Sequence, residues 1–238
     1  EFDEVRKCVS RIQAGGNIHQ HLDLIAGLPY EDYESFRRSF NHVYALQPEQ
    51  LQLGFLKVLK GSYMYEKAGE YQLQYQDRPP FEVLSTKWLS YGDIIRLKGI
   101  EEMVEVYYNS GQFTNTLQLL EKAFTDAFSM YEELGRYYEK NDLNMISHSR
   151  ITRYEILFDF AAEWDDKNKE EYRKLLIVDL YLRDNVKNRP AFAGEPTITK
   201  EESAQFYDKE AAGYYYLKGY EEYNKRQIRK MTHLEKIG

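Results

Sequence analysis

The start of the chain alternates between helical and strand patterns, and this alternation constrains the fold more than any other feature of the sequence. A helix is predicted over 2–14, where apolar residues recur at helical spacing. Two short apolar runs, 19–27 and 51–59, have the length of strands, and the segment between them, 31–46, reads as a helix. Two strands joined through a helix form a parallel pair.

A sheet of two parallel strands is incomplete. Parallel sheets normally have several members and are covered on both faces. Unpaired strand edges recruit other strands. We therefore expect either a homodimer formed through these strands or disorder in this part of the chain.

Beyond residue 86 the apolar spacing is helical almost throughout. Helices are predicted over 86–108, 115–140, 149–164, 169–185 and, as one or two helices, 200–236. The expected fold class is mainly α, with a small parallel β-α-β remnant of a partial (β/α) barrel and a C-terminal helical domain. The expected segments are 1–62 for the β/α units, 63–86 for a linker and 87–238 for the helical domain.

Composition excludes several classes of protein. The formal charge of −7 argues against a general nucleic-acid binder, which needs a basic surface. No apolar run reaches the roughly 18 residues of a membrane span. The only cysteine, Cys8, permits neither an intrachain disulfide nor a cysteine cage for a metal. The acidic start resembles no secretory signal and lacks Met, so we expect a cytoplasmic protein whose natural N-terminus lies further upstream.

Tyrosine is unusually common, with 22 residues. Most of these tyrosines fall within helical patterns, which favours rings buried in an amphipathic core with hydroxyls reaching a partner or water. Because basic residues do not gather beside the rings in the sequence, a base-stacking surface is disfavoured.

The most informative stretch is 22–31, Leu-Asp-Leu-Ile-Ala-Gly-Leu-Pro-Tyr-Glu. It reads as a strand that ends in a Gly-Leu-Pro turn and leads into an acidic helix start. In parallel α/β proteins such strand ends form the ligand-binding face. Gly27 permits a close backbone approach, and Pro29 fixes the turn.

This stretch resembles the radical S-adenosylmethionine superfamily. In that superfamily a late barrel strand reads Asp-hydrophobic-Ile-x-Gly-hydrophobic-Pro-Gly-Glu, and a Gly-Thr or Gly-Ser turn follows the next strand. The matching residues here are Asp23, Ile25, Gly27, Leu28, Pro29, Glu31 and Gly61-Ser62, whereas Tyr30 stands where the pattern has Gly. A closer likeness, to cobalamin-binding-domain radical enzymes with an uncharacterised C-terminal domain, includes the runs 51–62, 79–86 and 231–235.

The resemblance implies a C-terminal fragment that is not catalytic alone, whose partner is the missing N-terminal portion. It implies S-adenosylmethionine and a 4Fe-4S cluster for the parent protein only, because one cysteine cannot replace the family's three-cysteine loop. Cobalamin is a further candidate cofactor of the parent, and its use there is left open. The fragment itself is expected to hold no cofactor and no metal. By resemblance, the cofactor-facing positions are Asp23, Ile25, Gly27, Leu53, Gly54 and Phe55. No catalytic residue can be assigned.

Two other interpretations stay open. The helical part could be a freestanding protein-interaction domain, in which case residues 1–60 are dispensable. Alternatively, the alternating residues His19, His21 and Asp23 share one face of a strand, and two imidazoles with a carboxylate could bind the metal of a small hydrolase.

Overall fold

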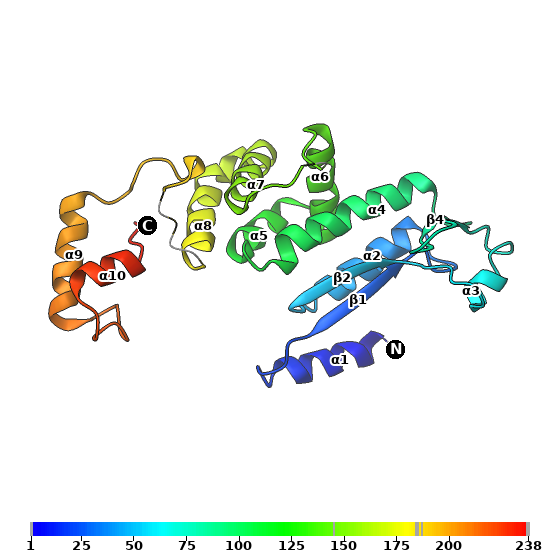
Figure 1. Ribbon diagram of the computed structural model, residues 1–238, viewed down its shortest axis with the longest axis horizontal. Helices are drawn as coiled ribbons and strands as arrows, with labels where there is room; N and C mark the ends of the chain where they lie inside the picture. Colours follow the sequence, from blue (N-terminus) through cyan, green and yellow to red (C-terminus); the bar gives the residue numbers. More distant parts are fainter. Residues whose placement is uncertain (1, 145, 184–185, 187, 237–238) are drawn as a thin grey trace. The chain divides into compact units, whose positions relative to one another are not determined.

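The chain is described by a computed structural model that covers residues 2–144, 146–183, 186 and 188–236 (Figure 1). It is mainly helical with a small parallel β-α-β element, as the sequence predicts. Among the described residues, no helix combines the length and the apolar character needed to cross a membrane.

The chain divides into two compact units, which we describe separately. Unit 1 comprises residues 1–111 and 120–146, and unit 2 comprises residues 112–119 and 147–238. This grouping follows packing rather than sequence order. The expected division at residues 62 and 86 remains a prediction, although the predicted linker 63–86 contains a short helix and two short strands.

In unit 1 the elements are α1 (Phe2–Gln13), β1 (His21–Ala26), α2 (Tyr33–Tyr44), β2 (Gln50–Phe55), α3 (Tyr63–Glu66), β3 (Gln74–Tyr75), β4 (Val83–Ser85), α4 (Tyr91–Met103), a π-helical turn η1 (Val104–Asn109), a 3₁₀ turn η2 (Glu121–Ala123) and α6 (Ala127–Lys140). Strands β1 and β2 are parallel, which confirms the predicted pairing, and their register pairs Ile25 with Gly54. Strands β3 and β4 form a separate antiparallel pair.

Helix α2 connects the two parallel strands and covers one face of their sheet. Asp32 caps its N-terminus, accepting a hydrogen bond from the Ser35 backbone while the Ser35 hydroxyl accepts from the Asp32 backbone. On its inner side Phe36 and Phe40 are fully buried. The covered face of the sheet presents a row of apolar residues to this core: Leu22, Leu24, Ala26, Leu51, Leu53 and Phe55.

The predicted helix 115–140 is wrong as a single element. It is two helices, α5 (Thr114–Leu120) and α6, because the chain becomes extended at Phe124. Asp126 then starts α6 by accepting a hydrogen bond from the Ser129 backbone, and an ion pair with Arg37 at 2.8 Å holds the Asp126 carboxylate in place. The apolar spacing continues across the break, so periodicity alone could not reveal the cap.

The predicted helix starting near residue 86 begins later, at Tyr91. Ser90 and Asp93 form a capping box there. The Thr86 hydroxyl accepts hydrogen bonds from the Trp88 and Leu89 backbones, which holds the preceding residues in a turn.

Unit 2 contains most of α5, then α7 (Arg150–Trp164), a 3₁₀ turn η3 (Asp166–Asn168), α8 (Lys169–Tyr181), a 3₁₀ turn η4 (Ala191–Ala193), α9 (Lys200–Gly213) and α10 (Lys225–Met231). The predicted C-terminal helical stretch is therefore two helices. In the core, the buried Asp179 of α8 accepts four hydrogen bonds of 2.7–3.0 Å from Asn115 and Thr116, so it caps α5 from a neighbouring helix.

Candidate functional site

The second face of the β1–β2 sheet is exposed. We call it the open face and define it by His21, Asp23 and Ile25 of β1 with Gln52 and Gly54 of β2, which the register places side by side. Ile25 keeps 47% of its surface exposed. Strand β1 pairs with β2 alone among the described residues, so the opposite edge of β1 has no strand partner there. A parallel sheet with one bare face and one bare edge is unusual in a soluble protein.

The residues predicted to face a cofactor fall in three places. Asp23, Ile25 and Gly54 lie on the open face. The side chains of Leu53 and Phe55 are buried on the covered face, at 4% and 8% exposure, so only their backbones could approach a ligand on the open side. Their role as cofactor contacts remains a prediction.

Gly27 lies buried at the end of β1 and has a backbone φ of +91°. A Cβ atom at this position would lie 2.7 Å from Cγ1 of Val83 in β4. Gly27 therefore meets two requirements at once, a left-handed backbone and close packing against β4. This explains the glycine without any ligand.

Tyr30 adopts a backbone φ of +68°, which glycine adopts at low cost and tyrosine does not. The Tyr30 ring lies 4.8 Å from the Trp88 ring and 5.9 Å from the Tyr71 ring, between centroids. Ring packing thus compensates for the backbone strain at the position where the radical S-adenosylmethionine pattern has Gly.

Glu31, the last residue of the resembling stretch, lies before the helix rather than in its first turn. Burial raises the pKa of the Glu31 carboxyl, and a 3.3 Å hydrogen bond from the Ser39 hydroxyl opposes this rise only in part. The Glu31 carboxyl, just before the cap of α2, therefore holds its proton to a higher pH than a free glutamate does.

The proposed metal face of His19, His21 and Asp23 is only partly assembled. The two imidazole rings lie 4.8 Å apart in an edge-to-face arrangement, and His19 precedes β1. Among the residues the structure describes, no three His, Cys, Asp or Glu side chains are arranged to hold a metal ion. The hydrolase interpretation stays a prediction.

Cys8 lies exposed on α1, although a free cysteine on a helix more often packs as a small apolar group. Within α1 only Val9 is buried, whereas Val5, one turn earlier, is 46% exposed. The helix contacts the rest of unit 1 along a narrow stripe, and Cys8 lies outside that stripe.

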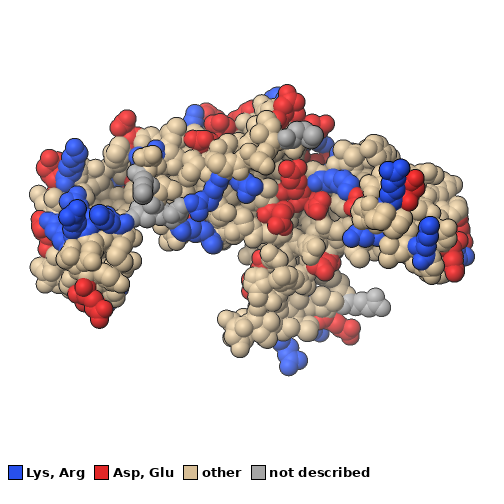
Figure 2. Space-filling view, in the orientation of Figure 1, with Lys and Arg blue, Asp and Glu red and all other residues tan. Residues whose placement is uncertain are grey.

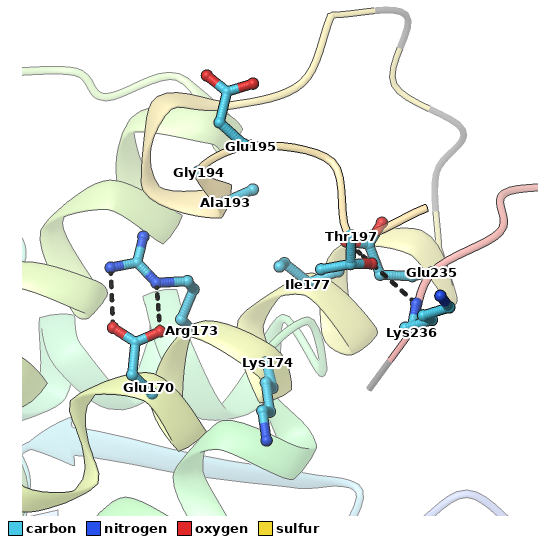
Figure 3. A pocket seen from close by; sticks show the side chains of 10 residues that line it. All are labelled: Glu170, Arg173, Lys174, Ile177, Ala193, Gly194, Glu195, Thr197, Glu235 and Lys236. Atoms are coloured by element: carbon cyan, nitrogen blue, oxygen red, sulfur yellow. Dashed lines mark hydrogen bonds and ion pairs between the residues drawn. The ribbon is translucent and has the colours of Figure 1, made fainter. Parts of the chain in front are cut away.

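A cavity of about 470 Å³ in unit 2 was not predicted from the sequence (Figure 3). Helix α8 provides one wall, the loop after η4 a second and the C-terminal segment a third; the lining residues are Glu170, Arg173, Lys174, Ile177, Ala193, Gly194, Glu195, Thr197, Glu235 and Lys236. Most of its charged groups are paired with other protein groups. Arg173 binds Glu170 at 3.1 Å, and Lys236 binds Glu202 at 2.6 Å. Protein partners therefore already neutralise most of the charge that lines the cavity, and a charged ligand would have to displace them.

Glu235 anchors the C-terminal segment beside this cavity. Its carboxylate accepts hydrogen bonds from Arg189, Thr197 and His233 at 2.7–3.1 Å. Burial tends to raise the pKa of Glu235, but the hydrogen bonds from Arg189 and His233 outweigh burial and lower it. The His233 ring stacks on the Tyr181 ring of α8 with centroids 3.3 Å apart. The run 231–235 thus has a structural role.

The comparison with protein families finds a match over more than half of the chain. A family described as a protein of unknown function, DUF4080, matches residues 69–238. The chain therefore belongs to the DUF4080 family. The match includes every element from β3 to α10, whereas β1 and β2 precede it. No curated protein matches the chain.

Proposed function

We propose that the chain is the C-terminal part of a radical S-adenosylmethionine enzyme and is not catalytic alone. In that enzyme, β1 and β2 would be the last two strands of the catalytic barrel. The helical region would cap that barrel or bind its substrate or a partner. The DUF4080 domain is associated with radical S-adenosylmethionine and cobalamin proteins, which supports this proposal.

The open face carries the proposal. In a (β/α) barrel each strand pairs at both edges, has a helix on its outer face and turns its other face toward the interior. The β1-α2-β2 element has the outer helix and the parallel pairing. The bare edge of β1 is where a preceding strand would pair, and the open face is where the barrel interior would lie.

The residues present fit the two cofactors of the family differently. Cys8 is the only cysteine, so this chain cannot supply a three-cysteine cluster site, and the cluster ligands would come from the missing N-terminal portion. S-Adenosylmethionine supplies the radical chemistry of this superfamily. Ile25 and Gly54, paired in register on the open face, offer an apolar side chain beside bare backbone, which suits a flat adenine ring.

Reconstitution of the chain with iron, sulfide and reductant tests the first half of the proposal. We expect no cluster absorption at about 400 nm and no cleavage of S-adenosylmethionine. Cluster absorption would show that the chain holds a cluster by itself, and cleavage would show that it is catalytic alone; either result would overturn this part of the proposal.

A matched pair of substitutions in the parent protein tests the second half. Ile25→Lys places a charge on the open face, and we expect it to abolish S-adenosylmethionine cleavage with the cluster intact. Ile95→Lys on α4 is the control, because Ile95 is exposed to the same degree, 46% against 47%. Equal activity of the two variants would exclude the open face from the cofactor site.

The bare edge of β1 has two candidate occupants, the missing N-terminal portion and a second copy of this chain. We propose the first, because the open face and the bare edge lie on the same strand, as barrel closure requires. Copurification of the chain with the separately expressed N-terminal portion would support this. A stable homodimer that excludes the N-terminal portion would contradict it.

A further inference from the structure

Helix α10 carries a concentration of positive charge that the net charge of the chain conceals. Its seven residues include Lys225, Arg226, Arg229 and Lys230 and no acidic residue. These four side chains alone line a shallow hollow of about 400 Å³. Blue side chains gather over α9 and α10 on the left of Figure 2.

The spacing of these residues directs them to one side of the helix. Arg226 and Lys230 are four residues apart, as are Lys225 and Arg229, so each pair lies along the helix axis. Ile228, between them, is buried at 1% exposure and attaches α10 to the protein. The basic side is thus turned away from the core.

Aromatic rings continue from this basic helix. Tyr216 is 81% exposed, and its ring lies 6.2 Å from the Phe206 ring at an interplanar angle of 27°. Phe206 in turn lies 5.3 Å from Tyr207, and the Arg229 guanidinium lies 5.5 Å from the Tyr207 ring centre. Tyr215, beside Tyr216, is 69% exposed. Ring contacts therefore link Tyr216 to Arg229, and this link passes through the Tyr207 ring, which is buried at 5% exposure.

Hydrogen bonds hold the exposed tyrosines in position. The buried Glu210 carboxylate accepts from the Tyr216 and Leu217 backbones, both at 2.9 Å. An ion pair between Lys225 and Asp208 joins α10 to α9. Because the loop is fixed at both ends, little conformational entropy is lost when a ligand stacks on it.

We infer that α10 and the tyrosines of the preceding loop form a binding surface for single-stranded nucleic acid. Lysine and arginine along one side of a helix suit a phosphate backbone, and exposed rings beside them suit unstacked bases. An anionic membrane is a poorer fit, since a membrane-bound helix presents an apolar face outward and α10 turns Ile228 inward. Glu221 and Glu222 of the same loop restrict the favourable charge to α10.

Fluorescence anisotropy with the full chain tests the inference. The probes are 12-nucleotide single strands of one mixed sequence, as RNA and as DNA, each with a 5′ fluorescein. We expect binding to at least one of them at micromolar concentration in low salt, weakening steeply as salt rises. No change in anisotropy up to about 50 µM protein in low salt would overturn the inference. Binding to phosphatidylserine vesicles without binding to either strand would overturn it as well.

Two variants locate the surface. Arg226→Gln with Lys230→Gln should weaken binding about tenfold or more and lower the salt slope by about 1.4, since each lost phosphate contact on a single strand contributes about 0.7. Tyr215→Leu with Tyr216→Leu should weaken binding about tenfold without changing the salt slope. The second pair keeps the test decisive if the first pair unfolds, which circular dichroism would reveal.

A matched control uses the same chemistry elsewhere. Lys7→Gln with Arg11→Gln removes two exposed basic side chains that are also four residues apart on a helix, α1. This variant should bind as the unmodified chain does. If the α1 variant and the α10 variant lose equal affinity, binding follows net charge alone and the inference fails.

Discussion

The side chain of Asn109 pairs with both backbone groups of Leu51. Its Oδ1 accepts a hydrogen bond from the Leu51 N–H at 2.9 Å, and its Nδ2 donates to the Leu51 carbonyl at 3.0 Å. Asn109 ends the π-helical turn η1, so the widened turn presents an amide to the edge of β2 as a neighbouring strand would. At Leu51 the edge of β2 is thus paired by a side chain, whereas the opposite edge of β1 has no strand partner in the described part of the chain.

Asn109→Asp should destabilise unit 1 by about 1–3 kcal/mol, because a carboxylate cannot donate to the buried Leu51 carbonyl. Urea denaturation followed by circular dichroism measures the loss. Asn17→Ala, at an exposed position outside the regular elements, is the control and should change stability little. Equal effects of the two substitutions would show that the Asn109 pair does not stabilise the strand edge.

The sequence predicts the β-α-β element well because each of its signals is local. Asp32 caps α2, and apolar residues recur at every second position of β2, at Leu51, Leu53 and Phe55. The role of Asn109 could not be predicted, since nothing in the sequence signals a π-helical turn or the distant residue that it meets. The break before Asp126 was missed for a related reason: its ion pair with Arg37 joins residues 89 positions apart.

Gly27 and Gly61 form a matched pair for testing backbone strain against packing. Both have positive φ values, +91° and +81°, but only Gly27 has a neighbour where a Cβ would go. Gly61→Ala should cost about 1 kcal/mol of stability from backbone strain alone. Gly27→Ala should cost about 2–5 kcal/mol, because overpacking against Val83 adds to the strain.

A double variant separates the two contributions at Gly27. Combining Gly27→Ala with Val83→Ala removes the clashing methyl, so the two substitutions should cost less together than the sum of their separate effects. Denaturation midpoints of the four proteins of this cycle provide the measurement. Strict additivity would show that contact with β4 does not explain the glycine.

At Tyr30, substitution by glycine should leave the protein more stable than substitution by alanine, which is the reverse of the usual order in a helix. Both substitutions remove the ring from Trp88 and Tyr71, but Tyr30→Gly also relieves the positive φ. The glycine variant should therefore be more stable than the alanine variant by about 1 kcal/mol. Arg38, exposed in the middle of α2, is the control, where alanine should be the more stable by about 1 kcal/mol. If the alanine variant is the more stable one at both positions, the backbone at Tyr30 is not strained.

The candidate site shows a similar limit of sequence reasoning. The alternation of His21 and Asp23 was sufficient to place both on one face of β1. The surface of α10 was missed because the net charge of the chain is negative and because the tyrosines lie apart from the basic residues in the sequence. Only the structure shows the ring contacts that run from Tyr216 through Phe206 and Tyr207 to Arg229. That connection depends on the packing of α9 against α10.

His233 gives unit 2 a dependence on pH. Burial lowers the pKa of the His233 imidazole, and the hydrogen bond to Glu235 opposes this decrease without cancelling it. Arg189, which binds the same carboxylate, adds to the decrease. The unfolded chain, with a histidine pKa of about 6.5, therefore takes up a proton at a higher pH than the folded chain does.

The contribution of His233 to stability is thus fully present above about pH 6.5 and is lost as pH falls toward the lower folded-state pKa. Unfolding of the chain by urea should require less denaturant at pH 5.5 than at pH 7.5, and His233→Gln should reduce this difference because it removes the titrating imidazole. His42→Gln is the control, since it removes an exposed imidazole from α2 in unit 1. If both variants keep the full pH dependence, protonation of His233 does not govern the attachment of the C-terminal segment to α8, and the stacking on Tyr181 is insensitive to the charge of the ring.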